Sequence, residues 1–103
     1  MLFERFLENY PDSPLSASVI IARGNAFEGL GEIKKAARAY LNSFSLYEDS
    51  PVAPEALTLL GNALVSLGQT DAGCQTLAQV LMRFPGSDFS LEVEKMMSEL
   101  QCP

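Results

Sequence analysis

The segment YPDSP at residues 10–14 decides the fold, because a close copy, YEDSP, occupies residues 47–51. A weaker copy, FPGSD, occupies residues 84–88, and each copy begins 37 residues after the previous one. A sequence motif that recurs at a fixed spacing of this size is typical of chains built from stacked structural units. The sequence therefore predicts a repeated unit rather than one irregular core.

The repeat extends well beyond these short segments. Residues 10–46 and 47–83 are identical at nine aligned positions: Tyr10/Tyr47, Asp12/Asp49, Ser13/Ser50, Pro14/Pro51, Gly24/Gly61, Asn25/Asn62, Ala26/Ala63, Leu30/Leu67 and Gly31/Gly68. Residues 1–9 match the end of a copy whose front is missing. We therefore expect a single domain over 1–103, in which 1–9 is the second helix of a truncated repeat. Residues 10–46 and 47–83 are full repeats, and 84–103 is the first helix of a terminal half repeat.

Each full repeat reads as two helices. The first begins at a serine suited to cap its amides (Ser13, Ser50, Ser87) and, in the full repeats, at a proline in the first helical position (Pro14, Pro51). Gly31 and Gly68 end these helices, because glycine tolerates the left-handed conformation. The second helices are expected at Ile33 to about Leu46 and at Thr70 to about Arg83. With no strand-like alternation, the sequence predicts an all-α protein of about six helices, including the short N-terminal one.

Composition limits the range of functions. The chain has 13 acidic and 7 basic residues, a net charge of −6, so the phosphates of nucleic acid would repel it. Its longest apolar run, ASVIIA at 17–22, is too short to cross a bilayer, and MLFERFLENY at 1–10 does not read as a signal peptide. The sequence contains no histidine, which removes Cys-His and Ser-His catalysis, and two cysteines alone make a zinc site improbable. We therefore expect no enzymatic activity, no cofactor and no metal.

The pattern of small and large residues resembles the tetratricopeptide repeat (TPR). Small residues stand where its helix backbones approach closely: Gly24, Ala36, Gly61 and Gly73. Large apolar residues stand at its bulky positions: Ile20, Leu57, Phe27, Leu64, Tyr40 and Leu77. The resemblance implies an α-solenoid, a right-handed superhelix of antiparallel helix pairs. Two features depart from it, because the usual unit has about 34 residues and Arg23 replaces an expected leucine.

A narrower resemblance covers nearly the whole chain. The segments FxxFLxxYPDSP at 3–14 and LGQTDAGCQTLAQVLMRFP at 67–85 are similar to the C-terminal TPR domain of the Tol-Pal system periplasmic proteins (YbgF/CpoB family). That resemblance implies a periplasmic adaptor that binds TolA and coordinates peptidoglycan synthesis with outer-membrane constriction at cell division. An outer-membrane assembly lipoprotein of the BamD type is an alternative. A self-associating structural repeat without a peptide ligand is another.

Cys74 and Cys102 allow two interpretations. In one, Cys74 is a small buried residue and Cys102 lies in a frayed tail. In the other, which we favour, antiparallel helices joined near Pro85 bring the two sulfurs level and a disulfide forms. Closing such a loop would stabilise the fold by about 3.5 kcal/mol. The bond requires an oxidising compartment, which the family resemblance supplies.

A protein or peptide partner is expected on the concave side, which the first helix of each pair lines in such stacks. The residues on that side are Ser18, Ile21, Asn25, Glu28, Glu55, Thr58, Asn62 and Val65, followed in the third copy by Glu92, Lys95 and Glu99. A side-chain amide can donate and accept together, so Asn25 and Asn62 suit an extended peptide backbone. Alternatively, these asparagines bond within the fold. This side mixes apolar patches with glutamates, which favours a partner segment with lysine and apolar residues.

The first ten residues also suggest self-association. Leu2, Phe3, Phe6, Leu7 and Tyr10 form an apolar stripe whose own helix partner is missing. A helix this short depends on docking to the next pair. Its remaining apolar area would favour pairing between copies of the chain.

Overall fold

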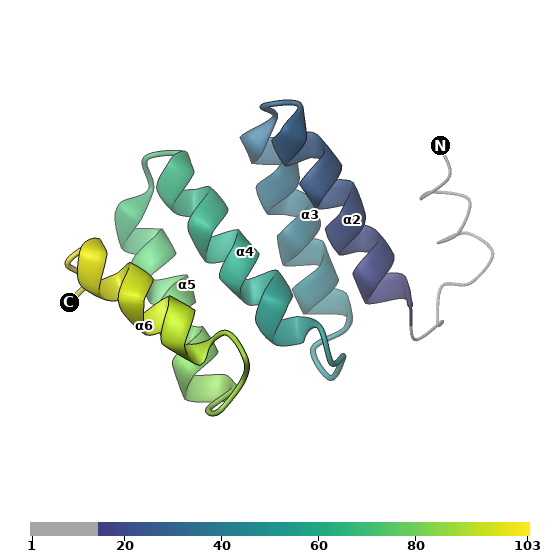
Figure 1. The fold of residues 1–103 in the computed structure, drawn as a ribbon. Coiled ribbons are helices and arrows are strands. Elements are labelled where there is room, and N and C mark those ends of the chain that lie inside the picture. Colours follow the sequence, from purple (N-terminus) through teal and green to yellow (C-terminus); the bar gives the residue numbers. More distant parts are fainter. Residues whose placement is uncertain (1–14) are drawn as a thin grey trace.

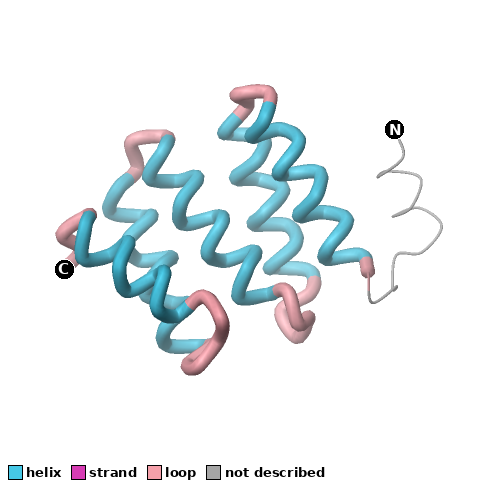
Figure 2. Tube along the Cα trace, viewed as in Figure 1, coloured by secondary structure: helices cyan, strands magenta, loops and turns pink. Residues whose placement is uncertain are grey.

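A computed structural model of the protein describes residues 15–103, and within them all regular structure is helical. The five helices are α2 (Ser16–Gly29), α3 (Ile33–Leu46), α4 (Ala53–Ser66), α5 (Thr70–Arg83) and α6 (Ser90–Glu99). Figure 1 and Figure 2 show them as successive antiparallel helices joined by short loops. The all-α prediction is confirmed for this part of the chain, whereas the helix expected at 1–9 lies outside it, as do Ser13 and Pro14.

The helices form two pairs and a terminal helix. Each helix packs chiefly against the helices next to it in the sequence, α2 on α3, α3 on α4, α4 on α5 and α5 on α6. In Figure 1, α2, α4 and α6 lie on the near side and α3 and α5 lie behind them. This is the arrangement of a TPR-like helical repeat, in which one face of the stack is built from first helices alone.

The first helix of each pair ends in the same way. Gly31 and Gly68 have φ angles of +79° and +83°, in the left-handed region that glycine adopts without strain. The N–H of Glu32 donates to the carbonyl of Phe27, and that of Gln69 donates to the carbonyl of Leu64, both at 2.9 Å. These bonds satisfy carbonyls at the helix ends and turn the chain back on itself. The predicted ends of both helices, and the bounds of α3 and α5, are confirmed.

The predicted starts of the first helices are wrong. Ser50 and Ser87 do not cap a helix, because α4 begins at Ala53 and α6 at Ser90, with Val52 and Phe89 at the N-cap positions. Instead, the carbonyl of Ser50 accepts from Ala53 N–H at 3.0 Å and its hydroxyl accepts from Val52 N–H at 3.2 Å. Ser50 therefore begins a separate turn that precedes α4. Within α4 itself, a second proline, Pro54, occupies the early helical position.

Close helix contact within each pair depends on glycine. A Cβ atom added to Gly24 would lie 2.5 Å from the Tyr40 ring, and one added to Gly61 would lie 2.8 Å from the side chain of Leu77. A Cβ on Gly73 would lie 3.0 Å from the carbonyl oxygen of Gly61 and 2.5 Å from a methyl of Val65. The α4–α5 pair is thus in contact backbone to backbone, which only glycine permits.

One apolar core runs through all five helices. It includes Ile21 of α2, Tyr40 of α3, Leu57 of α4, Leu77 of α5 and Val93 of α6, each at most 5% exposed. At the edge of this core, the Arg83 guanidinium lies 4.9 Å from the ring centroid of Phe44 and bonds Oε1 of Glu48 at 2.7 Å. These contacts tie the end of α5 to the end of α3.

A disulfide bond joins Cys74 of α5 to Cys102, just beyond α6. The Cα atoms of the two residues are 5.6 Å apart. The bond follows from the antiparallel course of α5 and α6 on either side of the Pro85 turn, as the favoured interpretation of the sequence expects. Gln101, which precedes Cys102, has a φ of +56°, so the chain ends α6 with a left-handed residue that is not glycine.

Candidate partner-binding face

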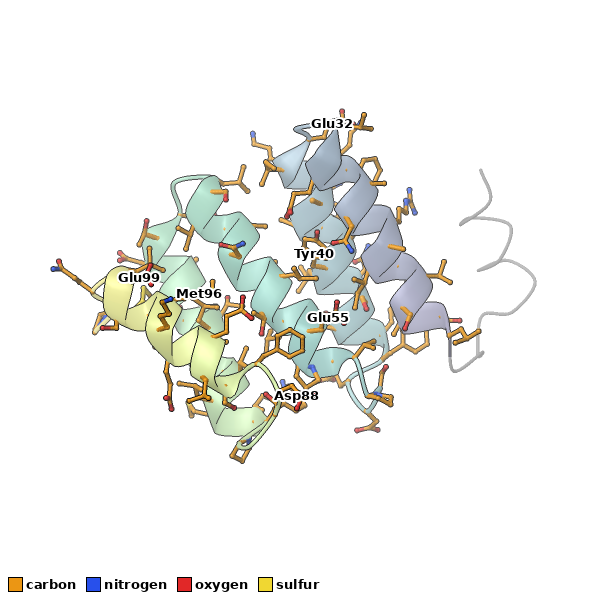
Figure 3. The ribbon with its side chains drawn as sticks, viewed as in Figure 1. Glu32, Tyr40, Glu55, Asp88, Met96 and Glu99 are labelled. Atoms are coloured by element: carbon orange, nitrogen blue, oxygen red, sulfur yellow. A yellow bond between two sulfur atoms is a disulfide. The ribbon has the colours of Figure 1, made fainter. Side chains whose placement is uncertain are left out.

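The face built by α2, α4 and α6 carries most of the residues expected to meet a partner. Ser18, Asn25 and Glu28 on α2 and Asn62 on α4 are exposed, while Glu55 and Val65 on α4 are half-buried. We call these six residues the inner face. Figure 3 shows Glu55 on α4 and Met96 and Glu99 on α6 on this same side of the molecule.

Two expected members of the site are buried instead. Ile21 is 4% exposed and belongs to the core, and Thr58 is 5% exposed. The Thr58 hydroxyl donates to the carbonyl of Pro54 at 2.8 Å, so its hydrogen bond is made within α4. Both residues lie on the side of their helix that the neighbouring elements cover. They therefore lie beneath the inner face and contribute almost no exposed surface to it.

Asn25 is held by a tyrosine from the second helix of its own pair. The Tyr40 hydroxyl donates to Oδ1 of Asn25 at 2.7 Å and lies 3.3 Å from Oε1 of Glu28. Figure 3 shows Tyr40 between α2 and α4. Burial, reinforced by the carboxylates of Glu28 and Glu55, raises the pKa of Tyr40 to about 12, so the hydroxyl keeps its proton at any physiological pH. The alternative in which this asparagine bonds within the fold therefore applies to Asn25.

Asn62 has the opposite character. The residue that matches Tyr40 in the α4–α5 pair is Leu77, which is fully buried and has no hydroxyl to offer. Among residues 15–103 the Asn62 carboxamide makes no hydrogen bond to any other group. An exposed amide with both its donor and its acceptor available can pair with a peptide backbone from another chain.

The inner face is acidic, and its carboxylates form no ion pair with another described residue. In the described part of the chain the ion pairs are Lys35 with Glu32 at 3.1 Å and Arg83 with Glu48 at 2.7 Å. Neither involves Glu28 or Glu55, nor Glu92 and Glu99 of α6. Unpaired carboxylates on one side of a protein attract a positively charged partner and raise its rate of association.

A groove of about 410 Å³ on α2 and α3 has a different chemistry. Its lining includes Ile20, Arg23, Phe27, Lys35, Arg38 and Leu46. The Arg23 guanidinium and the Lys35 ammonium lie 5.6 Å and 5.7 Å from the ring centroid of Phe27. This groove is basic and apolar, so it is complementary to the acidic inner face.

The residue that sequence reasoning missed is Tyr40, which was expected only as a bulky apolar residue. The sequence contains one signal for it. Both repeats have asparagine at the matching position (Asn25 and Asn62), but the second repeat has Leu77 where the first has Tyr40. Over residues 15–103, no group of three acidic or cysteine side chains is placed to hold a metal ion, and no helix is long and apolar enough to span a membrane.

Residues 55–87 match the family model of the tetratricopeptide repeat. The matched stretch contains nearly all of α4, all of α5 and the turn that follows. Together with the packing of adjacent helix pairs, the match supports a TPR-type domain. Repeats of this kind typically serve as non-catalytic modules for binding proteins or peptides. No curated protein sequence matches the chain.

Proposed function

We propose that this TPR-type domain is an adaptor of the bacterial periplasm that binds an extended, positively charged protein segment on its inner face. By its resemblance to the Tol-Pal TPR proteins, the segment would belong to a TolA-like protein. The adaptor would then link peptidoglycan synthesis to outer-membrane constriction during division.

The observation that carries the proposal is the exposed amide of Asn62 on an acidic surface. A peptide backbone needs a donor and an acceptor together, and Asn62 has both available. Lysine or arginine side chains of the segment would pair with Glu28 and Glu55, which have no cationic partner within residues 15–103. Apolar residues of the segment would contact Val65, which is half-buried.

The periplasmic part of the proposal is supported by the disulfide. Structural disulfides persist in oxidising compartments such as the periplasm and are rare in the bacterial cytosol. The bond between Cys74 and Cys102 therefore agrees with the location that the family resemblance implies.

The test compares two asparagines at matching positions. We expect Asn62→Ala to weaken binding of a TolA periplasmic segment about tenfold, since it removes hydrogen bonds to the partner. Asn25→Ala should weaken it by less, because the oxygen of Asn25 is already bonded to Tyr40. Both side chains are exposed, so circular dichroism should show folded variants. Isothermal titration calorimetry measures the affinities, and equal affinity for wild type and Asn62→Ala would contradict the proposed site.

Self-association is a second candidate function. The basic groove around Phe27, with Arg23, Lys35 and Arg38, is complementary in charge to α6, whose exposed side chains include Glu92, Glu94 and Glu99. Two copies could therefore meet end to end. Light scattering at low and high salt would detect such a complex, and a single mass at every salt concentration would argue against it.

A further inference from the structure

The terminal helix α6 is held in place by few contacts. Of its ten residues only Val93 is buried, while Met96 and Met97 are partly buried against the core. Its packing on α5 is much less extensive than the packing within either helix pair. A helix of this length is not stable alone in water. Its position therefore depends on whatever else attaches it to α5.

That attachment is the disulfide. Cys74 lies in the first half of α5, where it is 5% exposed. Cys102 follows the last turn of α6, and its N–H donates to the carbonyl of Met97 at 2.9 Å. The bond thus fixes the C-terminal end of α6 to α5, while the chain itself connects the other end through residues 84–89.

The bond is also accessible. A groove of about 400 Å³ lies beside it, lined by Asp71, Cys74, Gln75, Ala78 and Pro103. Cys102 is half-buried rather than enclosed. A small thiol can therefore approach the bond at Cys102 without unfolding of the helix pairs, which is the condition for reduction in the native state.

We propose that the Cys74–Cys102 bond is a redox-controlled clasp, whose reduction by a dithiol releases α6 while α2–α5 stay folded. The thiolate of the reductant attacks one sulfur, which breaks the protein disulfide and forms a mixed disulfide. The second thiol of the reductant then displaces the protein sulfur and closes the reductant's own disulfide. Two electrons and two protons pass to the protein, leaving Cys74 and Cys102 as thiols.

Release of α6 would change the partner-binding surface. Glu92, Lys95 and Glu99 of α6 are the residues that the repeat predicts next to the inner face. Without α6 the acidic surface is shortened and an apolar side of the α4–α5 pair becomes exposed. This consequence rests on the proposed function, and it predicts weaker binding of a basic segment by the reduced protein.

Hydrogen–deuterium exchange with dithiothreitol tests the clasp directly. We expect amides of residues 90–102 to exchange at least about tenfold faster in the reduced protein, because the cross-link no longer restricts local opening. Amides of α2, α3 and α4 should exchange at unchanged rates. Unchanged exchange in α6, or equal acceleration in all five helices, would overturn the proposal.

Two variants make the result specific to the bond. Cys102→Ser cannot form it, so its α6 should exchange fast with or without dithiothreitol, and slow exchange would overturn the proposal. Glu94→Gln changes an exposed residue of α6 and keeps the bond, so it should respond to dithiothreitol as the wild type does.

Exchange requires no partner, so it tests the clasp independently of the adaptor function. Failure of the oxidised protein to bind a TolA segment would contradict the proposed function and leave the exchange result intact. Binding that survives with unchanged affinity after α6 is released would show that α6 is not part of the site.

Discussion

The pairs α2–α3 and α4–α5 are built alike yet treat the same residue differently. All four helices have 14 residues, and α2 and α4 end in matching hydrogen bonds at Gly31 and Gly68. In the first pair the oxygen of Asn25 is bonded to Tyr40, whereas in the second pair Leu77 leaves Asn62 without a partner in the described chain. The role of a repeated residue therefore depends on which side chain faces it from the other helix of its pair.

The pairs also differ in how closely their helices approach. In the first pair the second helix contributes Ala36, which is fully buried and carries a methyl group. In the second pair the matching residue is Gly73, and no methyl fits between it and Gly61. The α4–α5 pair is therefore the more sensitive to added volume.

The largest effect is expected from Gly73→Ala. The added methyl meets backbone atoms of α4, so the helices must move apart, at a cost of about 2 kcal/mol in the free energy of unfolding. The reverse change in the first pair, Ala36→Gly, should cost about 1 kcal/mol through loss of helix propensity. Urea denaturation followed by circular dichroism measures both.

Gly29→Ala is the matched control for this substitution. A Cβ at Gly29 meets no atom within 4 Å, so the same chemical change should be neutral or slightly stabilising. If Gly73→Ala were also neutral, the two pairs would not differ in their closeness of packing.

A smaller effect is expected from Tyr40→Phe, which makes the first pair resemble the second. Loss of the bond to Asn25 should cost about 1 kcal/mol of stability at neutral pH. Because the pKa of Tyr40 is raised from 10.0 to about 12, the folded state holds its proton more tightly than the unfolded state does. The contribution of the Tyr40 hydroxyl to the free energy of unfolding is therefore fully present below pH 10 and is lost as the pH rises toward about 12.

Denaturation at several pH values measures this difference. Between pH 10 and about 12 the wild type should lose stability more steeply than Tyr40→Phe, because only the wild type has this hydroxyl. Parallel curves would mean that the Tyr40 hydroxyl is not shielded by α2 and α4.

The smallest effect concerns the end of α6, where the pattern of the two pairs is broken. Gln101 has the left-handed φ of +56°, where α2 and α4 are followed by glycine. Gln101→Gly should raise the free energy of unfolding by about 0.5 kcal/mol, because relief of strain exceeds the added freedom of the unfolded chain. Thermal unfolding of the oxidised protein measures it, and a lower melting temperature would contradict the prediction.

The sequence predicts the helices well because their signals are local. Gly31 and Gly68 mark the ends of α2 and α4, and the predicted bounds of α3 and α5 agree with the structure. The helix starts were misplaced because Ser50 and Pro51 have the chemistry of a cap while Pro54 lies three residues further on. Two overlapping start signals cannot be ranked without the geometry of the turn.

The inner face was only partly predictable, for a reason of geometry. Helical periodicity gives the direction in which a side chain points, but not how far the next pair extends over it. Ile21 and Thr58 were therefore expected on the surface and are buried. The bond from Tyr40 to Asn25 spans two helices, and it depends on a contact that spacing along the chain does not encode.

The packing of each helix chiefly on its neighbours in sequence has a consequence for folding speed. Contacts between adjacent elements require only short loops to close, so little chain entropy is lost before each contact forms. Proteins dominated by such local contacts fold within microseconds to milliseconds. We expect this domain to reach its helical stack on that timescale, with formation of the Cys74–Cys102 bond as the slow final step.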